Sequence, residues 1–275
     1  ESLQHHDIRF EPTMDTFDHA WGLLQVRGWP VGLGWSTPDL YVKDTLDEDW
    51  VPDRFGTPWV ALEDHGPSAR HADLVVNALY PTAGAVNERS GSEWCVLRPE
   101  FLFAPPFEVR DTRRVLVSFG GTDPANLTDL VASASWDRGL DGTVIPPPGN
   151  PAREARVGDG WRIASPSMAK EMLACDLLIC SAGRTLYEAA ALGVPAVVLA
   201  QNPREATHSH LGEGYGNIYL GMGRVVQPEV LRSTVEGVLG DRALRQDLSL
   251  AAKASVDGKG TSRIVHAVEG ILRGL

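Results

Sequence analysis

Cysteine is scarce in this sequence, whose 275 residues include only Cys95, Cys175 and Cys180. An odd count does not pair completely within one chain, and the spacing fits none of the usual metal-ligand patterns. Cys175 and Cys180 flank or lie in an apolar segment, where reduced thiols pack like small hydrophobic side chains. We therefore expect buried free thiols in a cytoplasmic protein, rather than a disulfide framework or a metal site.

Basic charge is also in deficit. The sequence has 25 Lys and Arg against 36 Asp and Glu, which gives a formal net charge of −11. Nucleic-acid binding needs a basic surface, so we expect no nucleic-acid partner. No apolar run approaches the ~20 residues of a membrane span, and no secretory leader follows Glu1. The 43% hydrophobic and 22% charged content is that of an ordinary globular protein.

Apolar strand candidates alternate with helix candidates along the chain, which indicates an α/β fold with mostly parallel sheets. A proline-bearing segment at 98–106 resembles a linker, so we expect one domain over residues 1–105 and a second over 106–275. The predicted strands are 40–42, 59–62, 74–76, 115–119, 142–145, 177–180 and 196–200. The predicted helices are 17–25, 125–135, 167–174, 229–239 and 261–272, with another that ends at Gly193.

The most informative segment runs from Ser181 to Glu188. It follows an apolar strand and opens a helix, and its small residues Ser181, Ala182 and Gly183 leave backbone amides bare at a helix N-terminus, where anions are favoured. Glu188 lies roughly 10 Å along the axis from Ser181 at ~1.5 Å per residue. Phosphate at the turn, with Thr185, and ribose hydroxyls at Glu188 would suit a nucleotide-sugar site. The alternative is a purely structural tight turn.

A second glycine-bearing turn, Gly120-Gly121-Thr122, also follows a strand and opens a helix. Paired glycines let backbone amides approach a diphosphate, and the threonine adds a hydroxyl. The turn is not the dinucleotide fingerprint, which needs further glycines at fixed spacing. The alternative is an ordinary turn capped by Asp123 and Asn126.

The loop after the 196–200 strand is dense in polar groups, with Gln201, Asn202, Glu205 and His208. Such side chains bind hydroxyls and phosphates, although a plain surface loop has the same composition. His208 and His210 form a His-x-His pair without acidic partners, so we expect no metal. In an open α/β sheet the loops after 119, 180 and 200 share the carboxyl edge, where ligands bind.

Glu63-Asp64-His65 follows the 59–62 strand of the first domain. His65 could face a cleft from that domain and act as a general base. The alternative is a polar end of a strand.

Five segments resemble the UDP-sugar hydrolases of pseudaminic acid biosynthesis and their spore-coat-polysaccharide relatives. They are 93–101 (EWCVLRPEF), 115–128 (VLVSFGGTDPANLT), 176–195, 257–260 (DGKG) and 62–80 (LEDHGPSARHADLVVNALY). The last is similar to the subgroup whose hydrolase-like domain follows an acylneuraminate cytidylyltransferase domain, of sialic acid metabolism. The resemblance covers roughly residues 38–275.

The resemblance implies a GT-B-like architecture, shared with MurG-type glycosyltransferases. It has two Rossmann-like, doubly wound domains, of which the first is incomplete here. It implies UDP held mainly by the second domain, with no cofactor and no metal. By matching motifs, the diphosphate would meet Gly121 and Thr122, the phosphates Ser181 to Gly183, and the ribose Glu188. Gln201, Asn202 and Glu205 would lie near the sugar or diphosphate.

One departure from the family concerns catalysis. The family opens with a glycine-rich loop, G-x-G-H-x-x-R, whose histidine is regarded as the base that activates water. This sequence has no such motif, and residues 1–37 match the family poorly. We expect either a fragment of a longer protein or a lineage without the loop. The base is therefore unassigned, with His65 and His208 as candidates.

Three functions remain open. The leading hypothesis is a hydrolase that releases UDP from a UDP-linked deoxyamino sugar. The second is a glycosyltransferase that uses the same donor with a sugar or lipid acceptor. The third is a non-catalytic nucleotide-sugar-binding module partnered with a cytidylyltransferase.

Overall fold

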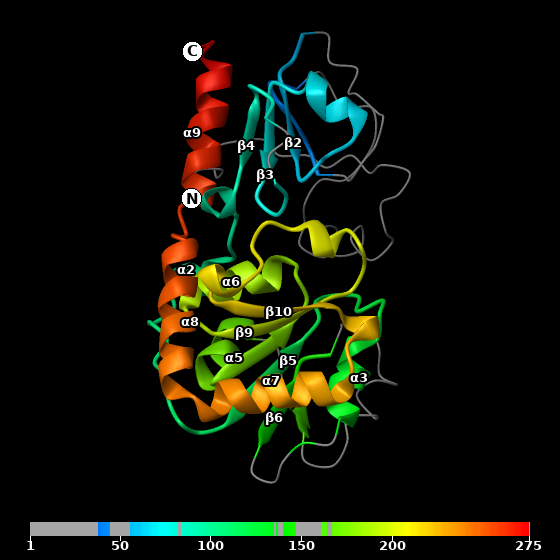
Figure 1. Cartoon of the computed structure of the whole chain (residues 1–275). Helices are drawn as coiled ribbons and strands as arrows, with labels where there is room; N and C mark the ends of the chain where they lie inside the picture. The colour runs from blue at the N-terminus through cyan, green and yellow to red at the C-terminus, as the bar shows by residue number, and fades with distance from the viewer. Residues whose placement is uncertain are drawn as a thin grey trace.

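The computed structural model describes residues 38–44, 56–81, 84–134, 136, 140–146, 161–163 and 167–274. They form two α/β domains, stacked one above the other, each built on its own parallel sheet (Figure 1). The predicted α/β class with parallel sheets is confirmed. The helix predicted for 17–25 lies outside the described residues.

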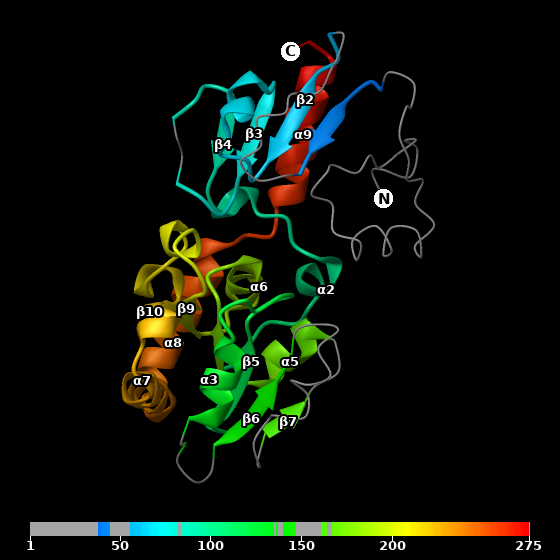
Figure 2. The same ribbon diagram turned by 90° about the vertical axis from the view of Figure 1, so that its right-hand side faces the viewer.

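The first sheet has four parallel strands in chain order, β1-β2-β3-β4. The central strands β2 and β3 are apolar except for Asn77, because both faces of the sheet are covered. A 3₁₀ turn, η1 (Pro67–His71), packs on one face, and helix α9 (Gly260–Leu272) packs on the other. Figure 2 shows α9 running along this sheet. The strands are β1 (Tyr41–Lys43), β2 (Trp59–Leu62), β3 (Leu74–Asn77) and β4 (Glu88–Ser90).

The second sheet has six parallel strands in the order β10-β9-β8-β5-β6-β7. Alternate residues of its strands feed two separate hydrophobic clusters, one on each face. The strands are β5 (Arg114–Ser118), β6 (Asp141–Val144), β7 (Trp161–Ile163), β8 (Leu177–Cys180), β9 (Ala196–Ala200) and β10 (Asn217–Met222). The helices are α3 (Leu127–Ser133), α5 (Met168–Ala174), α6 (Arg184–Leu192), α7 (Pro228–Gly240) and α8 (Arg242–Ser255).

The predicted strands and helices within the described residues are all present, with ends that shift by one or two residues. The sequence prediction omits β4, β7, β10, α8 and the short helix at Pro99–Leu102. Cys95, Cys175 and Cys180 are buried and free, as predicted.

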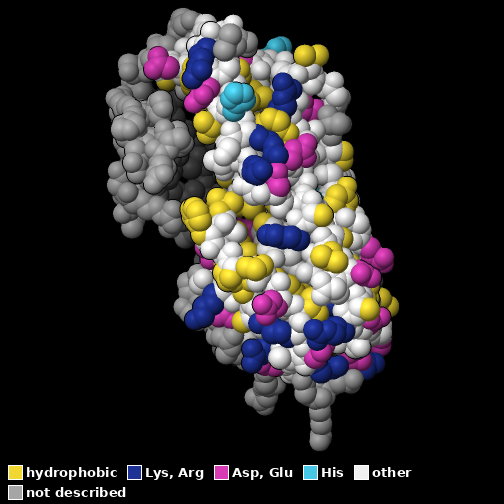
Figure 3. Space-filling view, turned by 90° about the vertical axis from the view of Figure 1, so that its left-hand side faces the viewer, with side chains coloured by type: hydrophobic (Ala, Val, Ile, Leu, Met, Phe, Trp, Pro, Cys, Tyr) yellow, Lys and Arg dark blue, Asp and Glu magenta, His cyan; other side chains and the backbone are white. Residues whose placement is uncertain are grey.

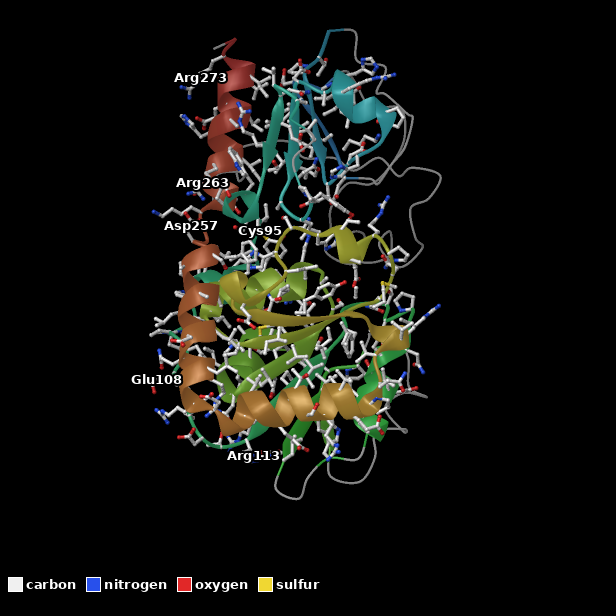
Figure 4. The ribbon with its side chains drawn as sticks, in the orientation of Figure 1. Cys95, Glu108, Arg113, Asp257, Arg263 and Arg273 are labelled. Carbon is white, nitrogen blue, oxygen red and sulfur yellow. The ribbon has the colours of Figure 1, made fainter. Side chains whose placement is uncertain are left out.

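The chain passes between the domains twice. The segment predicted as a linker, 98–106, contains a short helix, α2 (Pro99–Leu102), whose Phe101 is buried in the core beside α6. Near the C-terminus, the chain leaves α8 and returns to the first sheet as α9. Arg263 pairs with Asp257 at this crossing, next to Cys95 (Figure 4). The division at 105/106 stays a prediction, and the structure adds that α9 packs on the first sheet.

The surface that carries α8 and α9 intersperses basic and acidic side chains (Figure 3). Such a mixed surface lacks the one-signed stripe by which nucleic-acid-binding faces are recognised. Among the described helices, none combines the length and the apolar character that crossing a lipid bilayer requires.

Candidate functional site

The loops predicted to bind a ligand meet where the second sheet reverses its winding. From β5 the chain proceeds outward through β6 and β7, then returns to β8 on the other side of β5 and continues through β9 to β10. Ser118 at the end of β5 pairs in register with Cys180 at the end of β8, and Cys180 pairs with Val198 of β9. The loops after β5 and β8 therefore begin side by side at the topological switch point, where open α/β sheets bind ligands.

The loop after β5 is an open glycine turn anchored by one buried aspartate. Gly120 has a φ of 82°, a conformation that favours glycine, and neither Gly120 nor Gly121 has an atom near the position of a Cβ. Asp123 is fully buried, and its two carboxylate oxygens accept from the amides of Leu127 at 2.9 Å and Thr128 at 3.0 Å. Asp123 thus satisfies the first amides of α3, as predicted, whereas Asn126, at the N-cap position, makes no side-chain cap bond. Gly121 and Thr122 are exposed to solvent.

The loop after β8 presents the bare start of α6. Ser181 and Ala182 are buried, and the helix begins at Arg184 after Gly183, with no side chain capping its N-terminus. The first amides of a helix then carry partial positive charge that no side chain of the cap position satisfies. The helix ends at Gly193, as predicted, and the structure adds that Gly193 has the left-handed conformation, at φ 88°. The geometry of α6 suits an anion at Ser181–Gly183.

Glu188 lies in the second turn of α6 and is 8% exposed. Its Oε1 accepts from Nε of Arg98 at 2.8 Å, and its Oε2 accepts from the terminal NH2 of Arg98 at 3.2 Å. Burial raises the pKa of the Glu188 carboxyl, and the Arg98 guanidinium opposes that rise. The sequence prediction missed Arg98, although it lies in the quoted segment 93–101, because nothing local signals a partner on α6.

The loop after β9 is tied to the loop after β5 by Gln201. The Gln201 side chain donates from Nε2 to the Phe119 carbonyl at 2.7 Å and accepts at Oε1 from the Ala125 amide at 3.3 Å. The Glu205 carboxylate accepts from the Gln201 amide at 2.9 Å, and Asn202 Oδ1 accepts from the Glu205 amide at 3.0 Å. Burial raises the pKa of the Glu205 carboxyl, and hydrogen bonds from the backbone amides of Gln201 and Ala182 oppose that rise. These polar side chains organise the edge of the sheet, and their contact with a sugar stays a prediction.

The two candidate bases, His65 and His208, lie on either side of one tyrosine. The Tyr80 ring meets His65 edge-on with centroids 4.2 Å apart and meets His208 edge-on at 4.8 Å. His65 and Tyr80 belong to the first domain and His208 to the second, so this cluster lies between the domains. Burial lowers the pKa of both histidines, so both favour the neutral form.

The tautomer of His208 follows from its hydrogen bond. Nδ1 lies 2.6 Å from the Ala182 carbonyl, which only accepts, so Nδ1 carries the proton and Nε2 has a free lone pair. Nε2 is buried without a hydrogen-bond partner among the described residues. His65, by contrast, is exposed.

Glu63 bonds to the backbone of the first domain and also reaches α6 of the second, whereas Asp64 pairs within the first domain. Glu63 has a φ of 54° and accepts from the amides of Ala78 and Leu79, both at 3.2 Å, and it lies 3.7 Å from Arg184 of α6. Asp64 is buried and pairs with Lys43 at 2.9 Å.

His210 is a packing residue. Its ring stacks on Tyr187 with centroids 4.4 Å apart and lies 4.7 Å from Tyr215, and burial lowers its pKa to about 4. Within the described part of the chain, no three His, Cys, Asp or Glu residues gather in a way that could hold a metal ion.

A separate pocket lies at the opposite, amino end of β5 and β6, lined by Arg114, Asp141, Glu171 and Cys175 among others. Burial raises the pKa of the Cys175 thiol to about 12. The thiol therefore stays protonated and is a poor nucleophile.

No family model matches the chain. The chain is 27% identical over 230 residues to the spore coat polysaccharide biosynthesis protein SpsG of Bacillus subtilis, a match that covers 76% of this chain and 68% of that protein. It is 29% identical over 199 residues to protein MJ1062 of Methanocaldococcus jannaschii, covering 60% of this chain but only 41% of that protein.

Among solved structures, MurG of Acinetobacter baumannii superposes with a TM-score of 0.61 at 17% identity, over 95% of this chain and 89% of that chain. Identity this low shows the fold alone. The chain is thus homologous to SpsG and has the GT-B-like fold, with two Rossmann-like parallel domains.

Proposed function

We propose that this protein binds a UDP-sugar at the switch point of its second domain and hydrolyses it, in the biosynthesis of a nonulosonic acid or a surface polysaccharide. One observation carries the proposal. The glycine turn after β5 and the uncapped start of α6 lie side by side, with buried Glu188 on the same helix. Homology to a protein named for spore coat polysaccharide biosynthesis supports the same process.

The binding chemistry is divided among these elements. Backbone amides of Gly120, Gly121, Ser181 and Gly183 would hold the diphosphate, while the Ala182 amide already serves Glu205. The hydroxyls of Thr122 and Thr185 would add donors. The Glu188 carboxylate would accept from the ribose hydroxyls. No metal is needed for this binding, because the helix dipole and the amides supply the positive potential.

In the reaction, water would attack the anomeric carbon, the bond from that carbon to the diphosphate would break, and UDP would leave. Positive potential at α6 stabilises the charge that develops on the leaving diphosphate. A base must take the proton from water. His65 and His208 remain the candidates for that base. Exposed His65 can meet solvent, whereas Nε2 of His208 is enclosed beside Tyr80.

A glycosyltransferase is the second candidate, and the likeness of the fold to MurG favours it. The same donor site would then pass the sugar to an acceptor hydroxyl. A third candidate is a nucleotide-sugar-binding module that works beside a cytidylyltransferase domain or partner.

Calorimetry with UDP tests the binding site. Glu188→Ala should weaken UDP binding by ~1–3 kcal/mol, because the ribose hydroxyls lose their acceptor. Glu269→Ala is the control, since Glu269 is a half-exposed glutamate on α9, paired with Arg273. Equal affinity of the wild type and Glu188→Ala would refute the ribose assignment.

A second assay separates the three candidate functions. UDP release from UDP-4-amino sugars in water alone would indicate the hydrolase. Release that starts only when a sugar or lipid acceptor is added would indicate the transferase. Tight binding of UDP, with no release of UDP from the UDP-sugar either in water or with an acceptor, would indicate the binding module.

A further inference from the structure

The guanidinium of Arg98, in the segment between the domains, contacts three side chains. It pairs through two nitrogens with both carboxylate oxygens of Glu188, 90 residues away in sequence. Its NH1 lies 2.9 Å from Glu100, and its guanidinium lies over the Phe101 ring, 5.0 Å from the centroid. Three neighbours therefore fix the guanidinium plane, and that plane fixes the orientation of the Glu188 carboxylate.

The pairing does not use the full hydrogen-bonding capacity of the Glu188 carboxylate. Each carboxylate oxygen has two lone pairs, and Arg98 takes one from each. The remaining lone pairs can accept from two neighbouring hydroxyls, such as those at positions 2′ and 3′ of a ribose. The bidentate geometry thus orients the carboxylate without consuming its capacity as an acceptor.

From this geometry we propose that Arg98 is a positioning residue for the ribose: it holds Glu188 oriented and ionised so that the carboxylate accepts from both sugar hydroxyls of the nucleotide. The inference rests on the proposed function, since it assumes that a nucleotide binds at α6. It assigns to the segment between the domains a part in recognising a ribonucleotide.

Electrostatics support the assignment. The charged groups that act on Glu188 are Arg98, Glu100 and Arg184. Burial and Glu100 raise the pKa of the Glu188 carboxyl, while Arg98 and Arg184 lower it, and Arg98 has the larger effect of these two. Without Arg98 the pKa of Glu188 would rise further, and protonation would replace an acceptor oxygen by a hydroxyl donor.

The test compares UDP with 2′,3′-dideoxy-UDP, which keeps the base and the diphosphate but lacks the two hydroxyls. The wild type should bind UDP about tenfold or more tightly than the dideoxy compound, since hydrogen bonds to a charged acceptor are involved. Arg98→Met should lose most of that preference while keeping its affinity for dideoxy-UDP. Arg98→Lys should restore part of it, because the ammonium keeps the charge but not the two-nitrogen geometry.

UDP affinity measured over a series of pH values adds a second test, since a purely structural role of Arg98 would not change its pH dependence. In Arg98→Met, UDP affinity should recover as the pH rises and Glu188 ionises, whereas the wild type should change little. Arg114→Met is the matched control, because Arg114 forms a half-exposed pair with Asp141 at the far end of the sheet.

The outcomes separate the two levels of the proposal. If the wild type fails to bind UDP, or does not prefer it to dideoxy-UDP, the proposed site itself is wrong. If the wild type prefers UDP and Arg98→Met keeps the same preference, the positioning role is refuted. Equal weakening of UDP and dideoxy-UDP in Arg98→Met would also refute it, since the arginine would then act on the diphosphate or on the fold.

Discussion

Replacing Gln201 by alanine should destabilise the second domain by about 2–4 kcal/mol. Gln201 is 6% exposed, and its amide joins the Phe119 carbonyl to the Ala125 amide across the turn after β5. Leaving the buried Phe119 carbonyl without a donor lowers the free energy of unfolding by about 1–3 kcal/mol. Leaving the partly buried Ala125 amide without an acceptor lowers it by about 1 kcal/mol more. Folded domains are stable by only about 5–15 kcal/mol, so the change is large.

Urea unfolding followed by circular dichroism measures this effect. With a slope of about 1–3 kcal/mol per molar urea, the midpoint should fall by roughly 1 M. Gln201→Glu keeps the volume and the acceptor but loses the donor, so it should be destabilised comparably. Gln227→Ala is the matched control, because Gln227 is exposed and its side chain makes no cap hydrogen bond to α7. Equal midpoints for Gln201→Ala and Gln227→Ala would refute the proposed clamp.

Two further substitutions test packing between elements. His210→Phe should flatten the pH dependence of unfolding. The pKa of His210 is about 4 against an ordinary value of 6.5, so the unfolded chain binds the proton first. Stability is then full above about 6.5 and falls by about 3 kcal/mol as the pH drops to about 4. An unchanged slope in the variant, by chemical denaturation across that range, would contradict this. Gly260→Ala should lower the melting temperature, since a Cβ there would lie 2.1 Å from the Cys95 carbonyl oxygen, whereas Gly270→Ala, with nothing near its Cβ, should preserve or raise it. Equal melting temperatures for the two variants would show that α9 is not closely packed at its start.

Elements with strong local signals were predictable from the sequence. β8 and β9 are uninterrupted apolar runs because both of their faces are buried, and Gly193 ends α6 in the conformation that glycine favours. The omitted β4 is a polar edge strand whose residues carry no strand pattern. Helix α8 did carry a signal, with Asp241 as its cap and buried Leu248 and Ala252 four residues apart.

The site was predictable only as a set of loops. The parallel sheet places the turns after β5 and β8 at one edge, and both turns were recognised from small residues. The roles of the side chains in those loops could not be predicted from the sequence, because Asp123 and Gln201 form hydrogen bonds to the protein backbone. A composition rich in hydroxyl-binding groups does not distinguish a side chain that binds a ligand from one that organises the loop.

The sequence by itself determined the fold class, the order of most elements and the positions of the glycine turns, since these depend on patterns within one strand or one helix. Only the tertiary structure decided which side chains contact one another across long distances in the sequence. Gln201 reaches Phe119 across 82 residues, and Arg98 reaches Glu188 across 90. α9 returns to cover the first sheet, and Tyr80 brings the candidate bases His65 and His208 together. Such contacts depend on the path of the whole chain, because side chains far apart in sequence meet only after the sheets and helices have packed.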